Sequence, residues 1–525
     1  MDRWWERATL YQIYVRSWRD SDDDGYGDLR GIIGKLDYLE WLGIDGIWLS
    51  PTMPSPDKDW GYDVSDYLSV HPELGSLDDL DTLISAASGR GMRVLLDLVP
   101  NHTSTEHAWF VESAASRQSG KRDYYVWADP APGGGPPNNW VDFTGAPAWQ
   151  WHATTGQYYL HNFLVEQADL NWWNPAVHGE FERILRFWFD RGVAGFRIDV
   201  AHGLYKDALL RDNPPDDGEG PLGGRFGQRA VYNENRPEVH GLYKQWRKIA
   251  DSYDPPRLLL GETWVGDIGR LASFYGRDDE LQLAFNFPLV FAHFDADELA
   301  SVVGRTLGAL PRGACPVWTA SNHDVDRFPS RWCGGDQAKI KLALLVLATL
   351  PGTMVLYYGD EIGMTGVAVP RELSRDPLGG ATGRPSRDRA RTPMQWDDSP
   401  AAGFTSPGVT PWLPVGDAAG CNVAAQREDP SSVLTFCRAL LRLRSEQAGP
   451  DGSRYERLAA PAGVWRYAAG DVEVAANFTG QPATLQEPPQ GQLLLSTDGC
   501  GTVERGTGDY AVLAPWEGVI FARAR

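Results

Sequence analysis

The chain of 525 residues is 42% hydrophobic and 23% charged, a composition typical of a folded globular protein with two or three domains. Its formal net charge of −21 disfavours nucleic acid and anionic membranes as partners, because both would repel it. The sequence has no run of 18 apolar residues and begins without a signal-peptide pattern, so we expect a cytoplasmic protein with no membrane partner.

Strand-like and helix-like segments alternate along most of the chain, beginning with ATLYQIYVRSW, GIIGKLDYLEWLG and IDGIWLSP. The helical LDDLDTLISAASGRGMR then leads into VLLDLV, and similar pairs follow as far as TMVLYYGDE. We count eight strands in this series. Such alternation predicts a parallel sheet, and eight repeats predict an α/β fold with a closed (β/α)8 TIM barrel, built from residues 1–102 and 175–449.

Two further regions depart from this alternation. Residues 103–174 are rich in Gly, Pro, Trp and Asn, which predicts a loop-rich subdomain inserted after the third strand. A second Pro/Gly/Arg-rich segment, 364–415, follows the eighth strand. Residues 450–525 contain short, closely spaced strand patterns, which predict a C-terminal antiparallel β-sandwich domain.

The five cysteines are scattered, without the close spacing of a metal or redox motif. We therefore expect reduced thiols, and no disulfide or zinc site. They are Cys315, Cys333, Cys421, Cys437 and Cys500.

Four apolar runs each end in a carboxylate or a histidine: VLLDLVPNHTS, AGFRIDVAH, LLLGETW and PVWTASNHD. This pattern puts Asp199, Glu262 and Asp324 at the carboxyl ends of separate buried strands. Catalytic groups of a parallel barrel collect on that face. Two carboxylates aimed at one point are the minimal equipment for cleaving a glycosidic bond.

Together with EQADLN at 166–171, these motifs resemble those of the α-amylase family of glycoside hydrolases (family 13). The match is closest to the branch of the oligo-1,6-glucosidases and α-glucosidases. The resemblance implies that Asp199 is the nucleophile, Glu262 the acid/base and Asp324 the stabiliser of the transition state. It also implies a retaining reaction, in which the two reacting carboxyl groups lie about 5 Å apart.

The chemistry places different demands on these groups. The nucleophile must be ionised, and we expect Arg197, two residues earlier on the same strand, to hold the pKa of Asp199 down. The acid must carry a proton, which the apolar LLLG run and Trp264 favour at Glu262. Asp97, among apolar neighbours, is interpreted as a support for its loop.

The resemblance also implies a set of sugar-binding residues. Tyr62 would stack under the terminal glucose, and Asp59 would grip the distal hydroxyls with Arg387, the first of an arginine pair. Such a clamp would close the pocket, so that only a chain end could enter. The full predicted set is Asp59, Tyr62, His102, Phe143, Phe163, Gln167, Arg197, Val200, His323, Arg387 and Arg391.

The acidic segment DSDDDGYGD at 20–28 matches the first nine positions of a calcium-binding loop. The twelfth position is Gly31, so the bidentate glutamate of a helix–loop–helix site is missing. Relatives in this branch bind Ca²⁺ or Mg²⁺ with such a loop. We expect one structural ion and no organic cofactor, with ligands from Asp20, Asp22, Asp24, Tyr26 and Asp28.

The resulting expectation is an exo-acting, retaining α-glucosidase that releases glucose from the non-reducing end of short maltose- or isomaltose-type α-glucosides. The alternative is a transglucosidase, or an isomerase that converts sucrose or trehalose through the same covalent glucosyl-enzyme. A more remote alternative is a non-catalytic binding subunit. The partner is a small oligosaccharide, and the protein is a monomer or homodimer.

The linkage stays open at this point. A valine at position 200 accompanies α-1,6 cleavage in relatives, whereas alanine or threonine accompanies α-1,4 specificity. Three nearby segments depart from the oligo-1,6-glucosidase pattern, namely AHGLYKD, TWVGD and QADLN.

Overall fold

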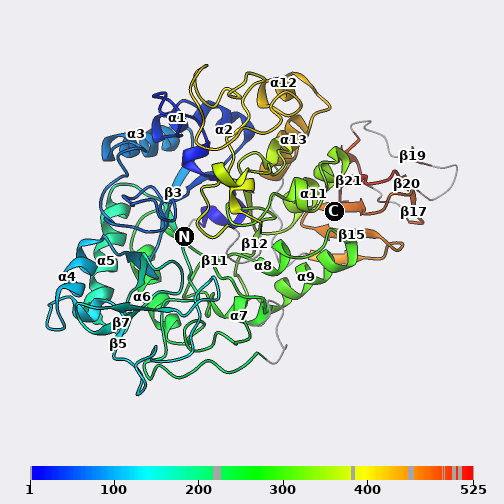
Figure 1. Ribbon diagram of the computed structural model, residues 1–525. Coiled ribbons are helices and arrows are strands. Elements are labelled where there is room, and N and C mark those ends of the chain that lie inside the picture. Colours follow the sequence, from blue (N-terminus) through cyan, green and yellow to red (C-terminus); the bar gives the residue numbers. More distant parts are fainter. Residues whose placement is uncertain are drawn as a thin grey trace.

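The computed structural model describes residues 3–216, 226–379, 385–446, 455–487, 489, 491–498, 504–505 and 511–523. Its centre is one eight-stranded parallel sheet, with the strand order β11-β10-β9-β3-β2-β1-β13-β12 (Figure 1). The strands are β1 (Thr9–Ile13), β2 (Gly46–Leu49), β3 (Arg93–Leu98), β9 (Gly195–Ile198), β10 (Leu258–Gly261), β11 (Leu283–Ala284), β12 (Val317–Trp318) and β13 (Thr353–Tyr357). Each predicted strand is present, and the predicted barrel is confirmed.

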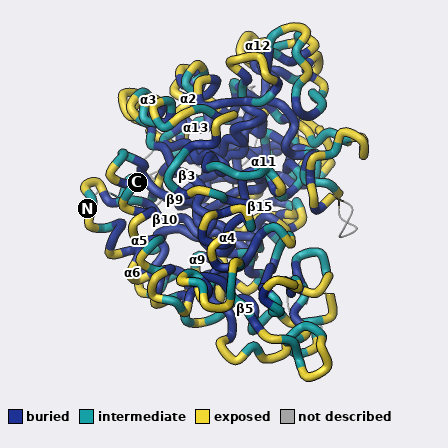
Figure 2. Tube along the Cα trace, turned by 60° about the vertical axis from the view of Figure 1, so that its left-hand side comes forward, coloured by how far each residue is buried: buried dark blue, intermediate teal, exposed yellow. Residues whose placement is uncertain are grey.

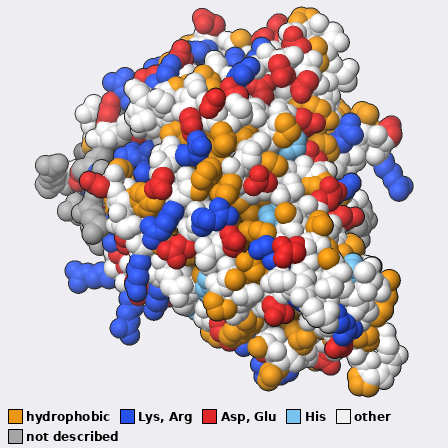
Figure 3. Space-filling view, turned by 90° about the vertical axis from the view of Figure 1, so that its left-hand side faces the viewer, with side chains coloured by type: hydrophobic (Ala, Val, Ile, Leu, Met, Phe, Trp, Pro, Cys, Tyr) orange, Lys and Arg blue, Asp and Glu red, His pale blue; other side chains and the backbone are white. Residues whose placement is uncertain are grey.

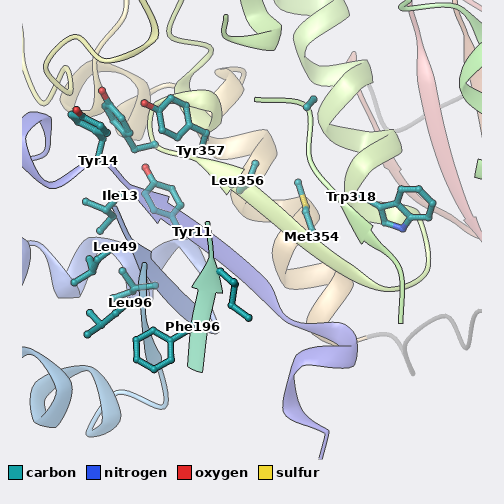
Figure 4. Close-up of a cluster of buried hydrophobic side chains, with 14 of the residues drawn as sticks. Tyr11, Ile13, Tyr14, Leu49, Leu96, Phe196, Trp318, Met354, Leu356 and Tyr357 are labelled. Atoms are coloured by element: carbon teal, nitrogen blue, oxygen red, sulfur yellow. The ribbon is translucent and has the colours of Figure 1, made fainter. Parts of the chain in front are cut away.

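The barrel encloses a core of its own, because successive strand residues point to opposite faces. Leu10 of β1, Leu283 of β11 and Val317 of β12 belong to one buried cluster, although β11 and β12 end the strand order. Side chains of β11 and β12 can meet in one cluster only if the sheet curls so that its two end strands face a common interior. Met354 and Leu356, which flank an interior position of β13, join the cluster between the sheet and its helices (Figure 4).

Helices cover the outside of the barrel, each burying one face against the strands (Figures 1 and 2). In α5, Asn174 caps the first turn, Pro175 opens it, and Phe181, Leu185 and Trp188 recur at helical spacing on the buried face. The main helices are α3 (Leu77–Ser88), α5 (Pro175–Asp190), α6 (Val239–Asp251), α9 (Ala296–Ala309), α11 (Gln337–Thr349) and α13 (Val433–Glu446).

The first predicted helix is divided into α1 (Leu29–Ile33) and α2 (Leu36–Leu42). Gly34 ends the first part, because glycine is a poor helix former. Gly43, at φ 93°, ends the second part in the left-handed region, as expected for a glycine stop. Shorter helices are α4 (Ala108–Ala115), α7 (Ile268–Ser273), α8 (Phe287–Val290), α10 (Phe328–Arg331) and α12 (Val423–Glu428).

The segment inserted after β3 has a small sheet and an aromatic core. Strands β5 (Trp127–Ala128), β7 (Gln157–Leu160) and β6 (Trp149–His152) pair in that order, and the stacked rings of Trp140 and Trp149 lie beneath them. The base of the segment is the ladder of β4 (His102–Ser104) and β8 (Gln167–Asp169). This ladder pairs His102 with Asp169 beside the barrel mouth.

Antiparallel strands make up the C-terminal part, away from the inserted segment (Figure 1). One sheet has the order β14-β15-β16-β21-β18 and the other β17-β20-β19. Their bounds are β14 (Tyr455–Leu458), β15 (Val464–Ala469), β16 (Val472–Asn477), β17 (Ala483–Leu485), β18 (Leu493–Ser496), β19 (Glu504–Arg505), β20 (Ala511–Leu513) and β21 (Gly518–Ala522). The predicted boundary at 449/450 and Cys500 lie outside the described residues.

Within the described ranges, the helices are all too short or too polar to cross a bilayer. The four described cysteines, Cys315, Cys333, Cys421 and Cys437, are free thiols.

Candidate active site

The site begins with the register of the barrel strands. Asp97 of β3 pairs with Arg197 of β9, and Arg197 pairs with Leu260 of β10. Because Leu95 and Leu260 belong to the interior cluster, the alternation turns Asp97 and Arg197 inward as well. They form a buried polar layer at the carboxyl end of the barrel, where the strand-end carboxylates follow.

Arg197 joins three carboxylates at this layer. Its Nη1 lies 2.9 Å from Asp97 Oδ1 and 2.7 Å from Asp199 Oδ1, and its Nη2 lies 2.7 Å from Glu262 Oε1. The second oxygen of Glu262 accepts the backbone N–H of Val200 at 3.0 Å. Asp199 and Glu262 are therefore held side by side on adjacent nitrogens of one guanidinium, with exposed fractions of 5% and 6%.

Two opposing effects act on the ionisation of Asp199. Burial raises the pKa of Asp199 well above its ordinary value, and the opposing effect of Arg197 is too small to reverse this. Burial also raises the pKa of Asp97 to about 7, again against Arg197. Arg197 lowers the pKa of Asp199, as the sequence predicts, but it is shared among three carboxylates in a dry layer, and the effect of burial is larger.

Asp324 has the opposite environment. Burial works against its charge, but the guanidinium groups of Arg387 and Arg391 lower its pKa. Arg387 Nη1 lies 3.1 Å and Arg391 Nη2 3.0 Å from Asp324 Oδ1. Burial lowers the pKa of His323 well below its ordinary value, so this ring is neutral and the arginines supply the positive charge.

The predicted partners of the sugar's far end come together. Arg387 Nη2 lies 2.7 Å from Asp59 Oδ1, so the arginine links Asp59 to Asp324. Tyr62 stacks on His323 with ring centres 5.2 Å apart and an interplanar angle of 1°. Its hydroxyl lies 2.6 Å from His323 Nε2 and 3.1 Å from Asp97 Oδ2.

His102 and Gln167 are fully enclosed by protein groups. His102 Nε2 lies 2.9 Å from the carbonyl oxygen of Tyr62, and its Nδ1 lies 3.0 Å from the Asn101 amide. Gln167 donates to Asp59 Oδ2 and approaches His102 Nε2, both at 3.2 Å. Gln167 therefore links the inserted segment to the Asp59 loop through a hydrogen bond.

The remaining predicted lining residues are aromatic or apolar. Phe163 stacks on Phe143 at 5.8 Å and packs against His102 at 5.2 Å, and both phenylalanines are half-buried. Val200 is buried and has φ 44°. This backbone conformation is rare for a β-branched residue and turns the chain directly after Asp199.

Sequence reasoning missed a buried cation behind this site. Lys206 Nζ is surrounded by oxygens: Asp169 Oδ2 at 2.7 Å, Asn101 Oδ1 at 2.6 Å and the Gly203 carbonyl at 2.8 Å. These partners come from the inserted segment, the end of β3 and the chain after β9. A lone lysine in AHGLYKD carries no motif, so no sequence signal could have found it.

The acidic loop gathers three of its five predicted ligands. Asp20, Asp22 and Asp28 each offer an oxygen within 4.8 Å of the others. Asp24 instead accepts the N–H of Tyr26 at 2.7 Å, and its carboxylate does not belong to the gathered group. Partial burial and repulsion from the other carboxylates raise the pKa of Asp22. No Lys or Arg forms an ion pair with these three carboxylates within the described ranges.

A parallel barrel with paired carboxylates and three arginines at the carboxyl end of its strands is typical of a glycoside hydrolase. Comparisons with known proteins agree. The family "Alpha amylase, catalytic domain" matches residues 12–450. The chain therefore belongs to the α-amylase family, and it is a glycoside hydrolase.

Individual relatives cover most of the chain. It is 41% identical to a "Probable alpha-glucosidase" of Rhizobium meliloti over 84% of this chain and 82% of the relative. It is 36% identical to an "Oligo-1,6-glucosidase" of Heyndrickxia coagulans over 99% of each. The crystal structure of the "alpha-glucosyl transfer enzyme, XgtA" superposes with a TM-score of 0.92 at 39% identity, covering 100% of both chains.

Proposed function

We propose that the protein is an exo-acting, retaining α-glucosidase that releases glucose from the non-reducing end of short α-glucosides. The observation that supports the exo mode is the Asp59–Arg387–Asp324 chain of ion pairs, which would block a sugar chain from extending past its terminal glucose. The α-glucosidase and oligo-1,6-glucosidase names of the relatives support the substrate class.

In the proposed reaction, Asp199 attacks the anomeric carbon while Glu262 gives its proton to the leaving oxygen. A covalent glucosyl–Asp199 ester forms, and the leaving sugar departs with that proton. Glu262 then takes a proton from water, whose oxygen attacks the same carbon and releases Asp199. Asp324, kept ionised by its arginines, holds the sugar hydroxyls as the ring flattens.

Arg197 couples the ionisation of the two reacting carboxylates, because it forms an ion pair with each of them. Since it contacts Asp199 and Glu262 through neighbouring nitrogens, a charge change on one is felt by the other. Three carboxylates around a single cation favour retention of a proton within this cluster near neutral pH. The cluster is therefore suited to holding one acid and one nucleophile at the same time.

End-blocked substrates test the exo mode. Maltose and p-nitrophenyl maltoheptaoside should yield glucose. The p-nitrophenyl maltoheptaoside that carries a 4,6-O-ethylidene group on its non-reducing end should not react. Rapid turnover of the blocked substrate, with internal cleavage products, would refute the proposal.

Transfer of glucose to another sugar is a second candidate function, because the structure superposes closely on an α-glucosyl transfer enzyme. In that case a sugar hydroxyl, instead of water, intercepts the glucosyl–Asp199 ester. Chromatography of products at high maltose concentration distinguishes the two. Free glucose as the main product supports hydrolysis, and sustained oligosaccharide formation with little free glucose supports transfer.

We further propose that Asp20, Asp22 and Asp28 hold one structural Ca²⁺ or Mg²⁺. Their carboxylate oxygens are the ligand type that both ions prefer, and the ion would offset their mutual repulsion. Asp20 also accepts the Thr405 hydroxyl at 2.6 Å, so the loop supports the segment after β13.

Chelation tests this metal proposal. Treatment with EDTA should lower the melting temperature by several degrees, and added Ca²⁺ or Mg²⁺ should restore it. The Asp22→Asn variant should lose most of this response. An unchanged melting temperature in EDTA, with no metal detected by elemental analysis, would contradict it.

A further inference from the structure

Arg387 is held by a carboxylate that no sequence motif singled out. Asp376 Oδ1 lies 2.8 Å from Arg387 Nε and 2.7 Å from its Nη2, and Oδ2 accepts the backbone N–H of Arg387 at 2.8 Å. Nη2 also contacts Asp59, and Nη1 contacts Asp324. Asp376 is thus the only one of the three carboxylates recorded with bonds to both the side chain and the backbone of Arg387.

Asp376 is fixed in turn by its own loop. It is 8% exposed, and its Oδ1 accepts the N–H of Leu378 at 3.1 Å. Asp388 Oδ2 accepts the N–H groups of Arg375 at 2.7 Å and Asp376 at 3.0 Å. Burial opposes the charge on Asp376, but Arg387 and Arg391 lower its pKa, so it is an anion at neutral pH.

The segment that carries Asp59 also contacts this loop. Trp60 Nε1 donates to the carbonyl oxygen of Arg375 at 2.7 Å. Asp59, the neighbour of Trp60, has its N–H held by Asp63 Oδ1 at 2.9 Å. Two segments more than 300 residues apart therefore meet at Arg387 and at Trp60.

We propose that Asp376 is a specificity-determining positioning residue, which locks Arg387 against Asp59 and so keeps the pocket closed behind the terminal sugar. This inference rests on the exo-glucosidase function proposed above. An arginine side chain has many rotamers, and a fork anchored at Nε leaves only its outer nitrogens free to contact Asp59 and Asp324.

Loss of the Asp376 charge would leave Arg387 with two carboxylates in place of three. The guanidinium could then turn further toward Asp324, which the sugar hydroxyls also need, and away from Asp59. Both effects weaken recognition of a chain end, while Asp199 and Glu262 keep their contacts with Arg197.

The test is the Asp376→Asn variant of the full-length protein, with Asp417→Asn as the matched control. Asp417 is an exposed loop aspartate that accepts the N–H of Gly420 and has no recorded contact with Arg387. Asp376→Asn should raise KM for maltose about tenfold and leave kcat within about threefold. It should also gain measurable turnover of end-blocked maltoheptaoside, as should Arg387→Ala.

Asp417→Asn should behave as the unmodified protein does. If Asp376→Asn keeps the original KM and rejects the blocked substrate while Arg387→Ala accepts it, Asp376 has no role in positioning. If the unmodified protein itself cleaves the blocked substrate, the exo function fails instead. Circular dichroism and the melting temperature show whether each variant is folded.

Discussion

At the scale of single residues, Val200 combines an unusual backbone with a chemical task. It has φ 44°, and its N–H donates to Glu262 Oε2 directly after the proposed nucleophile Asp199. Left-handed backbone at a β-branched residue costs free energy and persists only where surrounding contacts impose it. The Val200 side chain is buried.

Replacing Val200 by threonine should therefore change linkage preference more than stability. Threonine is β-branched and similar in size, so the backbone is retained while one methyl becomes a hydroxyl. We expect the ratio of kcat/KM for isomaltose to that for maltose to fall about tenfold, within the ~1–3 kcal/mol such a change can discriminate. Initial rates on both disaccharides measure this ratio. A ratio within twofold of the original would contradict a role of Val200 in linkage preference.

Sequence motifs predicted most of the site at this scale, because Asp59, Arg387 and Asp324 stand in recognisable patterns. The pKa of Asp199 was not predictable, since a sequence does not show how many carboxylates share Arg197 or how dry their layer is. Asp376 was missed because it lies in an irregular segment without periodicity.

At the scale of elements, a buried lysine connects the inserted segment to the barrel. Lys206, after β9, contacts Asp169 of β8 and Asn101 after β3. Burial lowers the pKa of Lys206, while Asp169 opposes that effect. Because β8 pairs with β4, which carries His102, this ion pair fixes the strand ladder at the barrel mouth.

Lys206→Met should destabilise the fold strongly. It leaves the Asp169 carboxylate buried without its cation, and breaking such a pair costs about 3–5 kcal/mol of the free energy of unfolding. The double variant Lys206→Met/Asp169→Asn should recover part of the loss. Urea unfolding measures all three proteins. A single variant as stable as the original would show that Asp169 finds another partner.

The turn after β13 gives a prediction about pH. Burial raises the pKa of Asp360 to about 7, although Arg327 opposes this. Between its ordinary value and 7, the unfolded chain is ionised at this residue while the folded chain keeps the proton. The free energy of unfolding therefore falls as pH rises through this window, by about 2 kcal/mol between pH 5 and 7 from this group alone.

The Asp360→Asn variant lacks this titration, so its stability relative to the original protein should increase from pH 5 to pH 8. Urea unfolding at both values provides the comparison. A constant difference between the two proteins would mean that Asp360 ionises normally in the folded state.

The helices and strands of the barrel were predictable, and the strands of the inserted segment were not. Helices such as α5 and strands such as β3 bury regular faces, which leave a clear periodic pattern. Strands β5 and β6 of the inserted segment span two and four residues, too few for a period to emerge. The break between α1 and α2 falls at Gly34, a glycine inside a helical pattern that the prediction ran through.

At the scale of the whole molecule, the net charge is strongly negative, whereas the active site pairs its carboxylates with arginines. Acidic and basic side chains are interspersed on the face shown in Figure 3, in a chain of net charge −21. Inside the pocket, Arg197, Arg387 and Arg391 offset the strand-end carboxylates at close range. A neutral sugar can enter such a protein without electrostatic penalty, which agrees with the composition-based expectation.

The central claim is that a glucosyl–Asp199 ester forms at the end of β9. The most direct test is to trap it with 5-fluoro-α-glucosyl fluoride, whose ring fluorine slows hydrolysis of the ester, and to locate the label by mass spectrometry of peptic peptides. The account predicts one glucosyl group per chain, on Asp199 in the segment GFRIDVAH. A label on Glu262 or another residue, or turnover without any covalent species, would contradict it.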